Sequence, residues 1–177
     1  MAVQIGAKPD AGFDDPIGML TDCHRRIEQF LGILCMVAER AAGRGLTGEE
    51  KAAVRSALQY FRIGGVRHTA DEEQSLFPRL RAEVGDASMA KLDALEADHE
   101  TANDLHESVE QMYREWMTDG ALSGERGEEL RAATDRLKAL YHAHIAVEES
   151  VVFPEAAKVL DSATIASMGR EFRGRRA

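Results

Sequence analysis

Two copies of a short motif in the sequence have the residue types and spacing to hold a metal ion. Residues 68–78 read HTADEEQSLFP and residues 144–154 read HIAVEESVVFP, so each copy has a histidine followed four residues later by a glutamate. On a helix, side chains four residues apart lie on one face, about 5–6 Å from each other. His68 with Glu72, and His144 with Glu148, can therefore each reach a single site.

Two further histidines stand at matching positions in the two halves of the chain. His24 precedes His68 by 44 residues, and His99 precedes His144 by 45 residues. The chain therefore looks like two copies of a helical hairpin related by an approximate twofold axis. Each half supplies one histidine and then one His-x-x-x-Glu pair.

Four histidines and two glutamates form a natural ligand set for two metal ions. Imidazole suits iron, zinc, copper and nickel, and carboxylates can bridge two ions. We expect two histidines for each metal, with Glu72 and Glu148 bridging both and a solvent oxygen closing a cluster of about 3.5–4 Å. Open coordination positions would then accept a small diatomic molecule or a peroxide. The alternative, a metal-free core in which these six side chains satisfy one another, is disfavoured because their burial costs too much free energy.

Long segments rich in Ala, Leu, Glu, Arg and Lys must position these residues. Breaks at residues 43–48, 85–86 and 119–124 separate four such segments, which show no alternating strand pattern. Because the connections are short, the predicted fold class is all-α, an antiparallel up-down four-helix bundle with a short C-terminal extension. Thr47 is a predicted N-cap, with Glu50 as its capping-box partner.

Each segment also carries a stripe of residues, spaced by three and four, that we expect to face the core. The four stripes are Leu20, His24, Ile27, Leu31, Leu34 and Ala38; Val54, Leu58, Phe61, Gly65, His68, Glu72 and Ser75; Leu92, Leu95, His99, Ala102, His106, Val109, Tyr113 and Trp116; and Leu130, Ala133, Leu137, Tyr141, His144, Glu148 and Val151. The Phe-Pro pair that ends each motif removes an amide donor, so it should bend or stop its helix.

Composition limits the class of protein. The chain has 177 residues, 44% of them hydrophobic, which is enough for one domain with a single core. Its formal net charge of −9 disfavours nucleic acid as a partner. Since no signal sequence or apolar run of membrane-spanning length is evident, we expect a soluble cytoplasmic protein without membrane contact.

The predicted organisation has three parts: an N-terminal arm (1–13), the bundle (14–157) and a C-terminal extension (158–177). The tail after Leu160 is expected to be a short helix that frays into a mobile terminus. On one helix, Cys23 and Cys35 would lie roughly 18 Å apart, too far for a disulfide.

Four stretches together resemble the hemerythrin-like HHE cation-binding family over roughly residues 14–157: residues 15–27 (DPIGMLTDCHRRI), 68–78, 96–105 (EADHETANDL) and 144–154. The resemblance implies a non-haem di-iron centre, oxo- or hydroxo-bridged, although manganese or zinc suits the same donors. The metal ligands that it implies are His24, His68, Glu72, His99, His144 and Glu148.

The sequence departs from the oxygen-carrying hemerythrins at one position. Those proteins use a fifth histidine one turn after the third-helix ligand, where this chain has Asn103. The ligand set instead resembles the hemerythrin-like domain of iron–sulfur cluster repair proteins and of bacterial stress or sensing proteins. Simple reversible oxygen storage is therefore disfavoured.

Three functions follow from this resemblance and the ligand set. The preferred one is a non-haem di-iron protein that binds or senses oxygen, nitric oxide or peroxide. The alternative is a di-iron enzyme, which would repair iron–sulfur clusters by donating iron or would reduce peroxide or nitric oxide. A third is an interaction module that signals to a partner, acting through the basic tail. No catalytic residue is assigned.

The remaining polar residues near the motifs receive structural interpretations. Glu73 and Glu149 are solvated or orient a ligand histidine. Glu28 and His142 are expected to face solvent, and His106 to be a hydrogen-bonded core residue.

One further hypothesis concerns a difference between the two repeats. One turn before the paired ligands, the first repeat has Gly65 and the second has Tyr141. A helical glycine costs roughly 1 kcal/mol relative to alanine, so Gly65 requires a reason. We predict that Gly65 leaves a void beside the site, towards which the Tyr141 hydroxyl points; close helix packing is an equally good reason.

Overall fold

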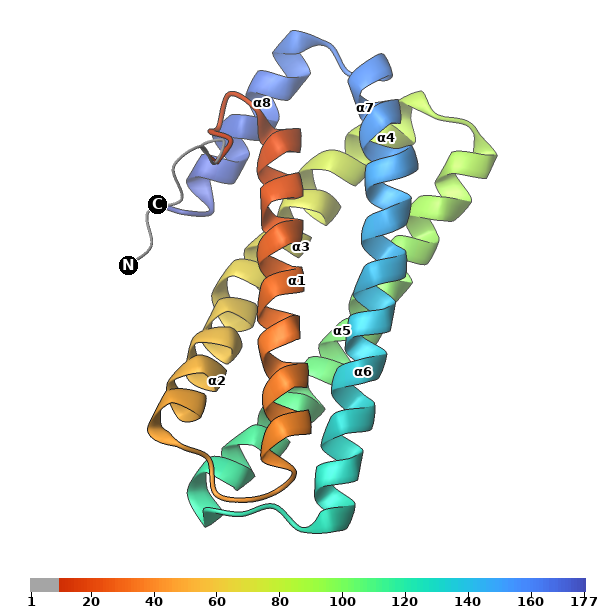
Figure 1. The fold of residues 1–177 in the computed structure, drawn as a ribbon. Helices are drawn as coiled ribbons and strands as arrows, with labels where there is room; N and C mark the ends of the chain where they lie inside the picture. The colour runs from red at the N-terminus through yellow and green to blue at the C-terminus, as the bar shows by residue number, and fades with distance from the viewer. Residues whose placement is uncertain (1–9) are drawn as a thin grey trace.

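A computed structural model of the chain describes residues 10–177, and within that range every regular element is helical. Residues 1–9, most of the predicted N-terminal arm, lie outside the described residues. The helices form an elongated bundle of four antiparallel rods, as Figure 1 shows. The predicted all-α bundle is thus confirmed.

Each rod is one long helix or a series of shorter helices joined without a break. The first rod is α1 (Pro16–Ala41) and the third is α5 (Asp86–Asp119). The second rod consists of α2 (Gly48–Tyr60), the π-helical turn η1 (Phe61–Gly65), α3 (Val66–Asp71), the π-helical turn η2 (Glu72–Leu76) and α4 (Phe77–Glu83). The fourth consists of α6 (Gly124–Val147), the π-helical turn η3 (Glu148–Val152) and α7 (Phe153–Val159).

Three of the four rods begin at a residue whose side chain caps the helix. Thr47 and Glu50 form the predicted capping box at the start of α2, since each side chain bonds the backbone of the other residue. Asp15 and Ser123 cap α1 and α6 in the same position, each accepting from an amide three residues on. All three predicted breaks fall between rods.

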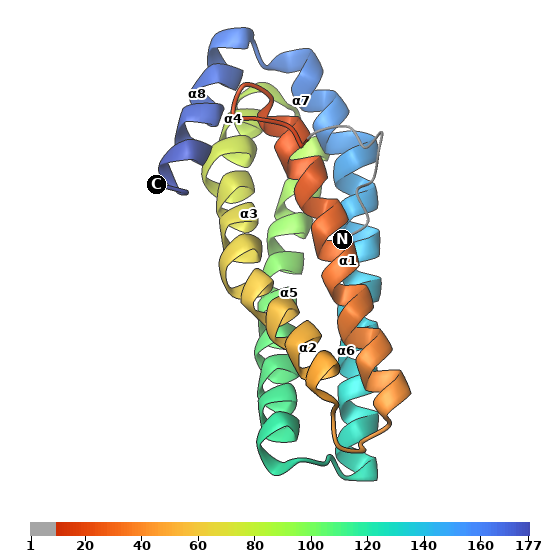
Figure 2. The same cartoon turned by 60° about the vertical axis from the view of Figure 1, so that its left-hand side comes forward.

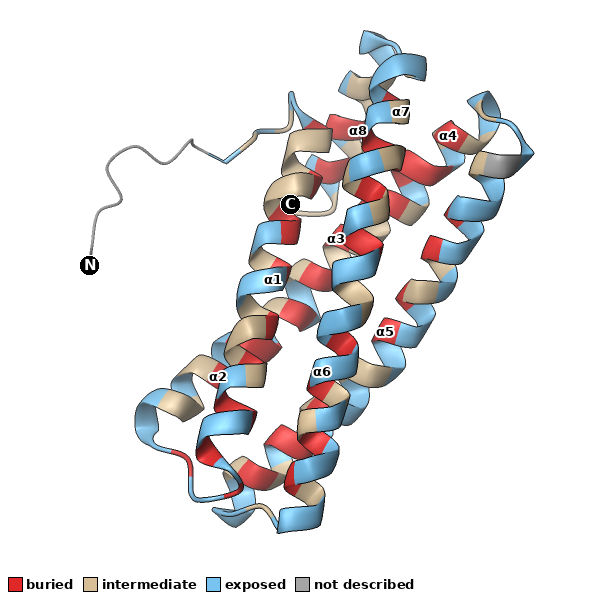
Figure 3. Cartoon of the chain, turned by 45° about the vertical axis from the view of Figure 1, so that its right-hand side comes forward, coloured by how far each residue is buried: buried red, intermediate tan, exposed pale blue. Residues whose placement is uncertain are grey.

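The predicted stripes form the core, with a few exceptions (Figure 3). Ala133, Tyr141 and His106 are only partly buried. Val151 is also partly buried, and its neighbour Val152 takes the core position instead. Val152 follows Glu148 by four residues, a spacing that also keeps a side chain on the same helical face.

The Phe-Pro pairs do not stop their helices. Pro78 and Pro154 lie in the first turns of α4 and α7, which continue to Glu83 and Val159. The perturbation lies before each proline, in η2 and η3. Each of these π-helical turns begins at one of the two motif glutamates, Glu72 and Glu148.

The C-terminal extension contains the short helix that the sequence predicts. Helix α8 (Ser162–Gly174) packs beside α1 and α3, as Figure 2 shows. Met168 and Phe172 are fully buried. A Cβ atom at Gly169 would lie 1.8 Å from the carbonyl oxygen of Phe13, so the close approach requires glycine there. The basic residues that follow are used within the chain, as Arg175 and Arg176 pair with the buried Asp71.

Within residues 10–177, no helix is both long and apolar enough to cross a membrane.

Candidate metal centre

The histidine and glutamate of each motif, together with His24 and His99, lie in one buried layer of the bundle. Two groups of four have ligand atoms within 4.8 Å of one another, and both groups contain Glu72 and Glu148. One group adds His24 and His68, and the other adds His99 and His144. None of the six is more than 4% exposed. The structure thus brings together every residue that the sequence proposes for this site.

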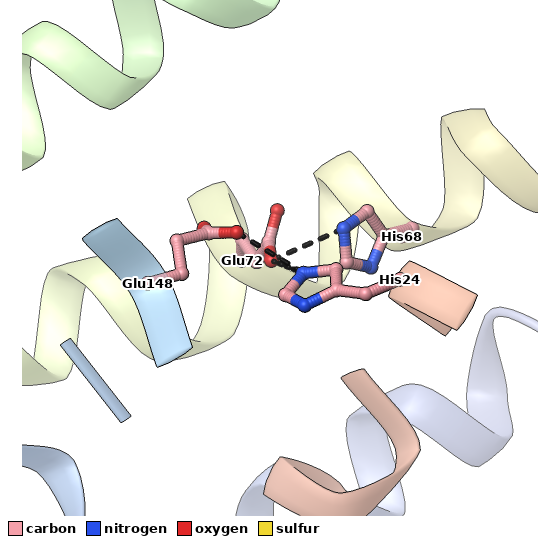
Figure 4. Close-up of side chains that lie close together, drawn as sticks. All are labelled: His24, His68, Glu72 and Glu148. Atoms are coloured by element: carbon pink, nitrogen blue, oxygen red, sulfur yellow. Dashed lines mark ion pairs between the residues drawn. The ribbon is translucent and has the colours of Figure 1, made fainter. Parts of the chain in front are cut away.

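In the first group, the Nε2 atoms of both histidines face the carboxylates (Figure 4). Nε2 of His24 lies 3.1 Å from Oε2 of Glu148 and 3.8 Å from Oε1 of Glu72. Nε2 of His68 lies 3.3 Å from the same Oε1 atom. Helices α1 and α3 therefore supply the nitrogens of this half-site.

The second group repeats the arrangement on α5 and α6. Nε2 of His99 lies 3.4 Å from Oε2 of Glu72, and Nε2 of His144 lies 3.3 Å from Oε2 of Glu148. Glu72 thus directs Oε1 to the first half-site and Oε2 to the second. Such a shared carboxylate is what a dinuclear site requires.

Unsatisfied polar atoms test whether this donor set fits a metal. Both carboxylate oxygens of Glu72 and of Glu148 are buried without a hydrogen bond among the described residues, as are the Nε2 atoms of His24 and His144. Although these atoms approach one another to 3.1–3.8 Å, they make no hydrogen bonds. Leaving so many buried polar atoms unpaired is costly, whereas metal coordination would satisfy all of them. The residues therefore fit a pair of metal ions.

The pKa shifts of these side chains also indicate that the layer favours positive charge. Burial lowers the pKa of His24, but the carboxylates of Glu148 and Glu72 raise it by more, to about 10. His99 behaves likewise, with a pKa raised to about 9 mainly by Glu72. Burial raises the pKa of Glu72, yet the surrounding histidines bring it well below its usual range. Two carboxylates among four imidazoles thus attract positive charge.

Outer carboxylates hold three of the four histidines through their Nδ1 atoms. Glu149 lies 2.9 Å from Nδ1 of His24, and Glu73 lies 2.8 Å from Nδ1 of His99. Each of these glutamates belongs to the opposite hairpin, so the two halves hold each other's histidines. Such contacts fix the ring orientation and the tautomer of a metal ligand. The orienting role considered for Glu73 and Glu149 is the one that the structure shows.

Sequence reasoning missed Asp98, whose Oδ2 lies 3.4 Å from Nδ1 of His144. Its only sequence signal is its place directly before His99, which does not reveal contact with a residue of another helix. It also missed a role for the phenylalanines of the Phe-Pro pairs. The ring of Phe153 stacks on His24 at 5.4 Å, and that of Phe77 on His99 at 6.2 Å, so they shield the histidines from water.

The other polar residues near the motifs lie outside the metal layer. Glu28 is exposed and pairs with Arg25, and His142 is exposed, as predicted. His106 is partly buried, and its Nε2 lies 3.1 Å from the Tyr141 hydroxyl. Gly65 and Tyr141 line one cleft of about 530 Å³, so there is a void at Gly65, but it does not open onto the six site residues. None of the six site residues lines this cleft.

Comparison with known proteins agrees with this geometry. The profile of the hemerythrin HHE cation-binding domain matches residues 15–156. A Haemophilus influenzae protein without a characterised function is 28% identical over 166 residues, which cover 94% of this chain and 92% of that protein. Because the profile spans all four rods and the six clustered histidines and glutamates, the chain belongs to the hemerythrin HHE cation-binding domain family.

Proposed function

We propose that this chain is a non-haem di-iron protein that binds or senses oxygen, nitric oxide or peroxide. One iron would be held by His24 and His68, and the other by His99 and His144. Glu72 and Glu148 would serve both ions. The observation that carries the proposal is the pair of four-residue groups that share both carboxylates in a buried layer.

The ligand count supports open coordination at both ions. Each group contributes two imidazoles and two carboxylates. Asn103, at the position of the fifth histidine of oxygen carriers, is exposed, lies on the wall of the cleft and belongs to neither group. Iron bound here would supply redox chemistry and open positions for a small ligand. The chain would orient the imidazoles through Glu73 and Glu149 and exclude water with Phe77 and Phe153.

Metal quantification tests the ligand assignment. After anaerobic loading, we expect about two iron ions per chain, and at most about one in His24→Ala and in His99→Ala. His142→Ala is the matched control, because His142 is exposed on the same rod as His144 and should retain both ions. Circular dichroism would verify that each variant is folded. Folded wild-type protein without stoichiometric iron would overturn the proposal.

Optical spectra of the loaded protein test the small ligand. We expect near-ultraviolet and visible bands that shift when oxygen, nitric oxide or hydrogen peroxide is added to the anaerobic protein. A spectrum that none of the three changes would contradict the binding or sensing role.

A second candidate function, a di-iron enzyme, is favoured by the ligand count. Because neither four-residue group contains a third histidine, each ion would keep open positions at which peroxide or nitric oxide would react. Turnover of peroxide or nitric oxide, or transfer of iron to an apo iron–sulfur protein, would establish this function. Reversible binding without either activity would leave a carrier or sensor.

A further inference from the structure

The cleft between the second rod and α5 is lined by Gly65 of the first hairpin and Tyr141 of the second, which occupy matching positions. A Cβ atom at Gly65 would meet only Phe61, at 3.6 and 4.0 Å, which are ordinary contact distances. Close packing between rods therefore does not require this glycine. Gly65 also ends η1, a π-helical turn that has no counterpart before Tyr141 in the regular helix α6. Both features leave space on the side of the bundle where the cleft opens.

The walls of the cleft have the composition of a small-molecule site. Leu58, Phe61 and Val66 provide apolar surface, and Val66 is 61% exposed because none of residues 10–177 covers it. A few convergent polar groups in an otherwise apolar pocket of several hundred Å³ are typical of sites for small organic ligands. Besides the charged residues of the rim and Thr69, Gln74 and Asn103, the polar groups of the lining are the imidazole of His106 and the hydroxyl of Tyr141, which lie 3.1 Å apart.

The charges around the cleft select the kind of occupant. Burial lowers the pKa of His106 to about 4, so its imidazole is neutral at pH 7. The rim carries three carboxylates, Glu73, Glu107 and Glu110, against one guanidinium, Arg62, which pairs with Glu110 at 3.0 Å. The net negative charge of the rim would repel an anion, whereas it would not repel an uncharged molecule.

The cleft adjoins the second half-site of the metal layer. Glu73 lines the cleft and lies 2.8 Å from Nδ1 of His99. The ring of Tyr141 lies 6.5 Å from that of His144. An occupant would therefore touch residues that contact both histidines of that half-site.

We propose that this cleft binds a small, uncharged and largely apolar organic molecule, anchored by a hydrogen bond to the His106–Tyr141 pair. The inference goes beyond the proposed function, since the cleft and its lining do not depend on a bound metal. Only an effect of the occupant on the metal spectrum rests on the proposed function.

Two nearly isosteric probes test the inference: 4-methylbenzyl alcohol, which is uncharged, and 4-methylbenzoate, which is an anion. Binding to the full chain would be measured by calorimetry and by saturation-transfer NMR, with and without iron. We expect the alcohol to bind at least tenfold more tightly than the carboxylate. Equal affinities, or no binding of the alcohol at millimolar concentration, would overturn the proposal.

Variants place the probe in the cleft. Gly65→Leu should fill the space and weaken binding of the alcohol at least tenfold, whereas Gly32→Leu should leave it unchanged, because Gly32 lies on α1 with nothing within 4 Å of its Cβ position. Tyr141→Phe should weaken binding about threefold to tenfold through loss of one hydrogen bond. If Gly65→Leu does not fold, Val66→Glu at an exposed wall position replaces it, with a weakening of at least threefold expected. Unchanged binding in the folded cleft variants would refute the site.

The spectrum of bound iron distinguishes failure of the cleft from failure of the metal site. In iron-loaded protein, the alcohol should shift the visible spectrum through Glu73 and Tyr141. Binding of the alcohol to a chain that fails to load iron would contradict the proposed function while supporting the cleft.

Discussion

At the scale of single residues, the two half-sites differ in one outer contact. Asp98, directly before His99, lies 3.4 Å from Nδ1 of His144. The equivalent residue in the first hairpin, directly before His24, is Cys23, and Nδ1 of His68 is buried without a hydrogen bond among the described residues. An outer carboxylate raises the basicity of a ligand imidazole and fixes its ring. We therefore expect the His99–His144 half-site to bind metal more tightly.

Substitution of Cys23 tests this asymmetry. Cys23→Asp should raise the affinity of the weaker half-site by about tenfold or more, because the pseudo-twofold axis places the new carboxylate beside His68 as Asp98 lies beside His144. Stepwise metal titration would measure the two binding constants. Cys23→Ser, which removes the thiol without adding a charge, should produce no gain. Equal binding constants in the wild-type protein would contradict the argument.

At the scale of helices, α8 secures the segment that carries two of the site residues. Asp71, between His68 and Glu72 in sequence, is fully buried and pairs with Arg175 at 2.8 Å and with Arg176 at 2.6 Å. Arg79 on α4 binds Glu171 on α8, and Ser75 on η2 donates to the same carboxylate. The extension therefore holds α3 and η2 in place from outside the bundle. Two of the four arginines of the basic tail, Arg175 and Arg176, are therefore paired within the chain.

Removing the two arginines tests the role of α8. Arg175→Gln with Arg176→Gln leaves the Asp71 carboxylate buried without a cation and should lower the free energy of unfolding by about 2–3 kcal/mol. Urea unfolding would measure the change. Arg170→Gln, an exposed position on the same helix, is the control and should change stability by less than about 0.5 kcal/mol. A double variant as stable as this control would show that the pairs to Asp71 contribute nothing.

At the scale of the whole molecule, the candidate metal layer divides the apolar core into two clusters. One cluster surrounds Leu34, Tyr113 and Trp116, near the loops after α1 and α5. The other surrounds Leu76, Phe153 and Phe172, where α8 packs. A polar layer between them contributes little hydrophobic stabilisation, so bound metal should contribute strongly to the stability of the whole bundle.

The stabilisation by metal should grow with pH. In the metal-free protein, the pKa values of His24 and His99 are raised to about 10 and about 9, so their protonated forms pair with the carboxylates. This stability is fully present below the unfolded pKa of about 6.5 and is lost as the pH rises through 9 to 10. Metal must also displace these protons, so its affinity rises over the same range.

Thermal unfolding with and without zinc, at a fixed free concentration, would measure this effect at pH 6.5 and pH 8.5. Zinc is a redox-inert ion for the same donors. The increase in Tm due to metal should be larger at pH 8.5. An increase that is equal or smaller at pH 8.5 would contradict the expectation.

The sequence by itself determined the features that depend on local spacing. Helical periodicity identified the rods and most of the core. Glycine-containing breaks identified the connections, and Thr47 with Glu50 identified a capping box. Since each hairpin repeats one pattern, the six residues of the candidate metal layer could also be identified from spacing alone. The helical stripes, the capping box and each His-x-x-x-Glu pair involve residues within one or two helical turns, and the chain needs no other segment to form them.

Only the tertiary structure decided the features that depend on distant segments. Asp71 and Arg175 are 104 residues apart, so no local pattern predicts that the tail is fixed by a buried carboxylate. Val152 rather than Val151 joins the apolar cluster around Phe153, and spacing cannot choose between them, because residues three and four positions after Glu148 both lie near its helical face. The cleft beside Gly65 likewise needs the walls of α5 and α6 to exist. Residue spacing predicted which side chains would meet, while packing between helices decided what surrounds them.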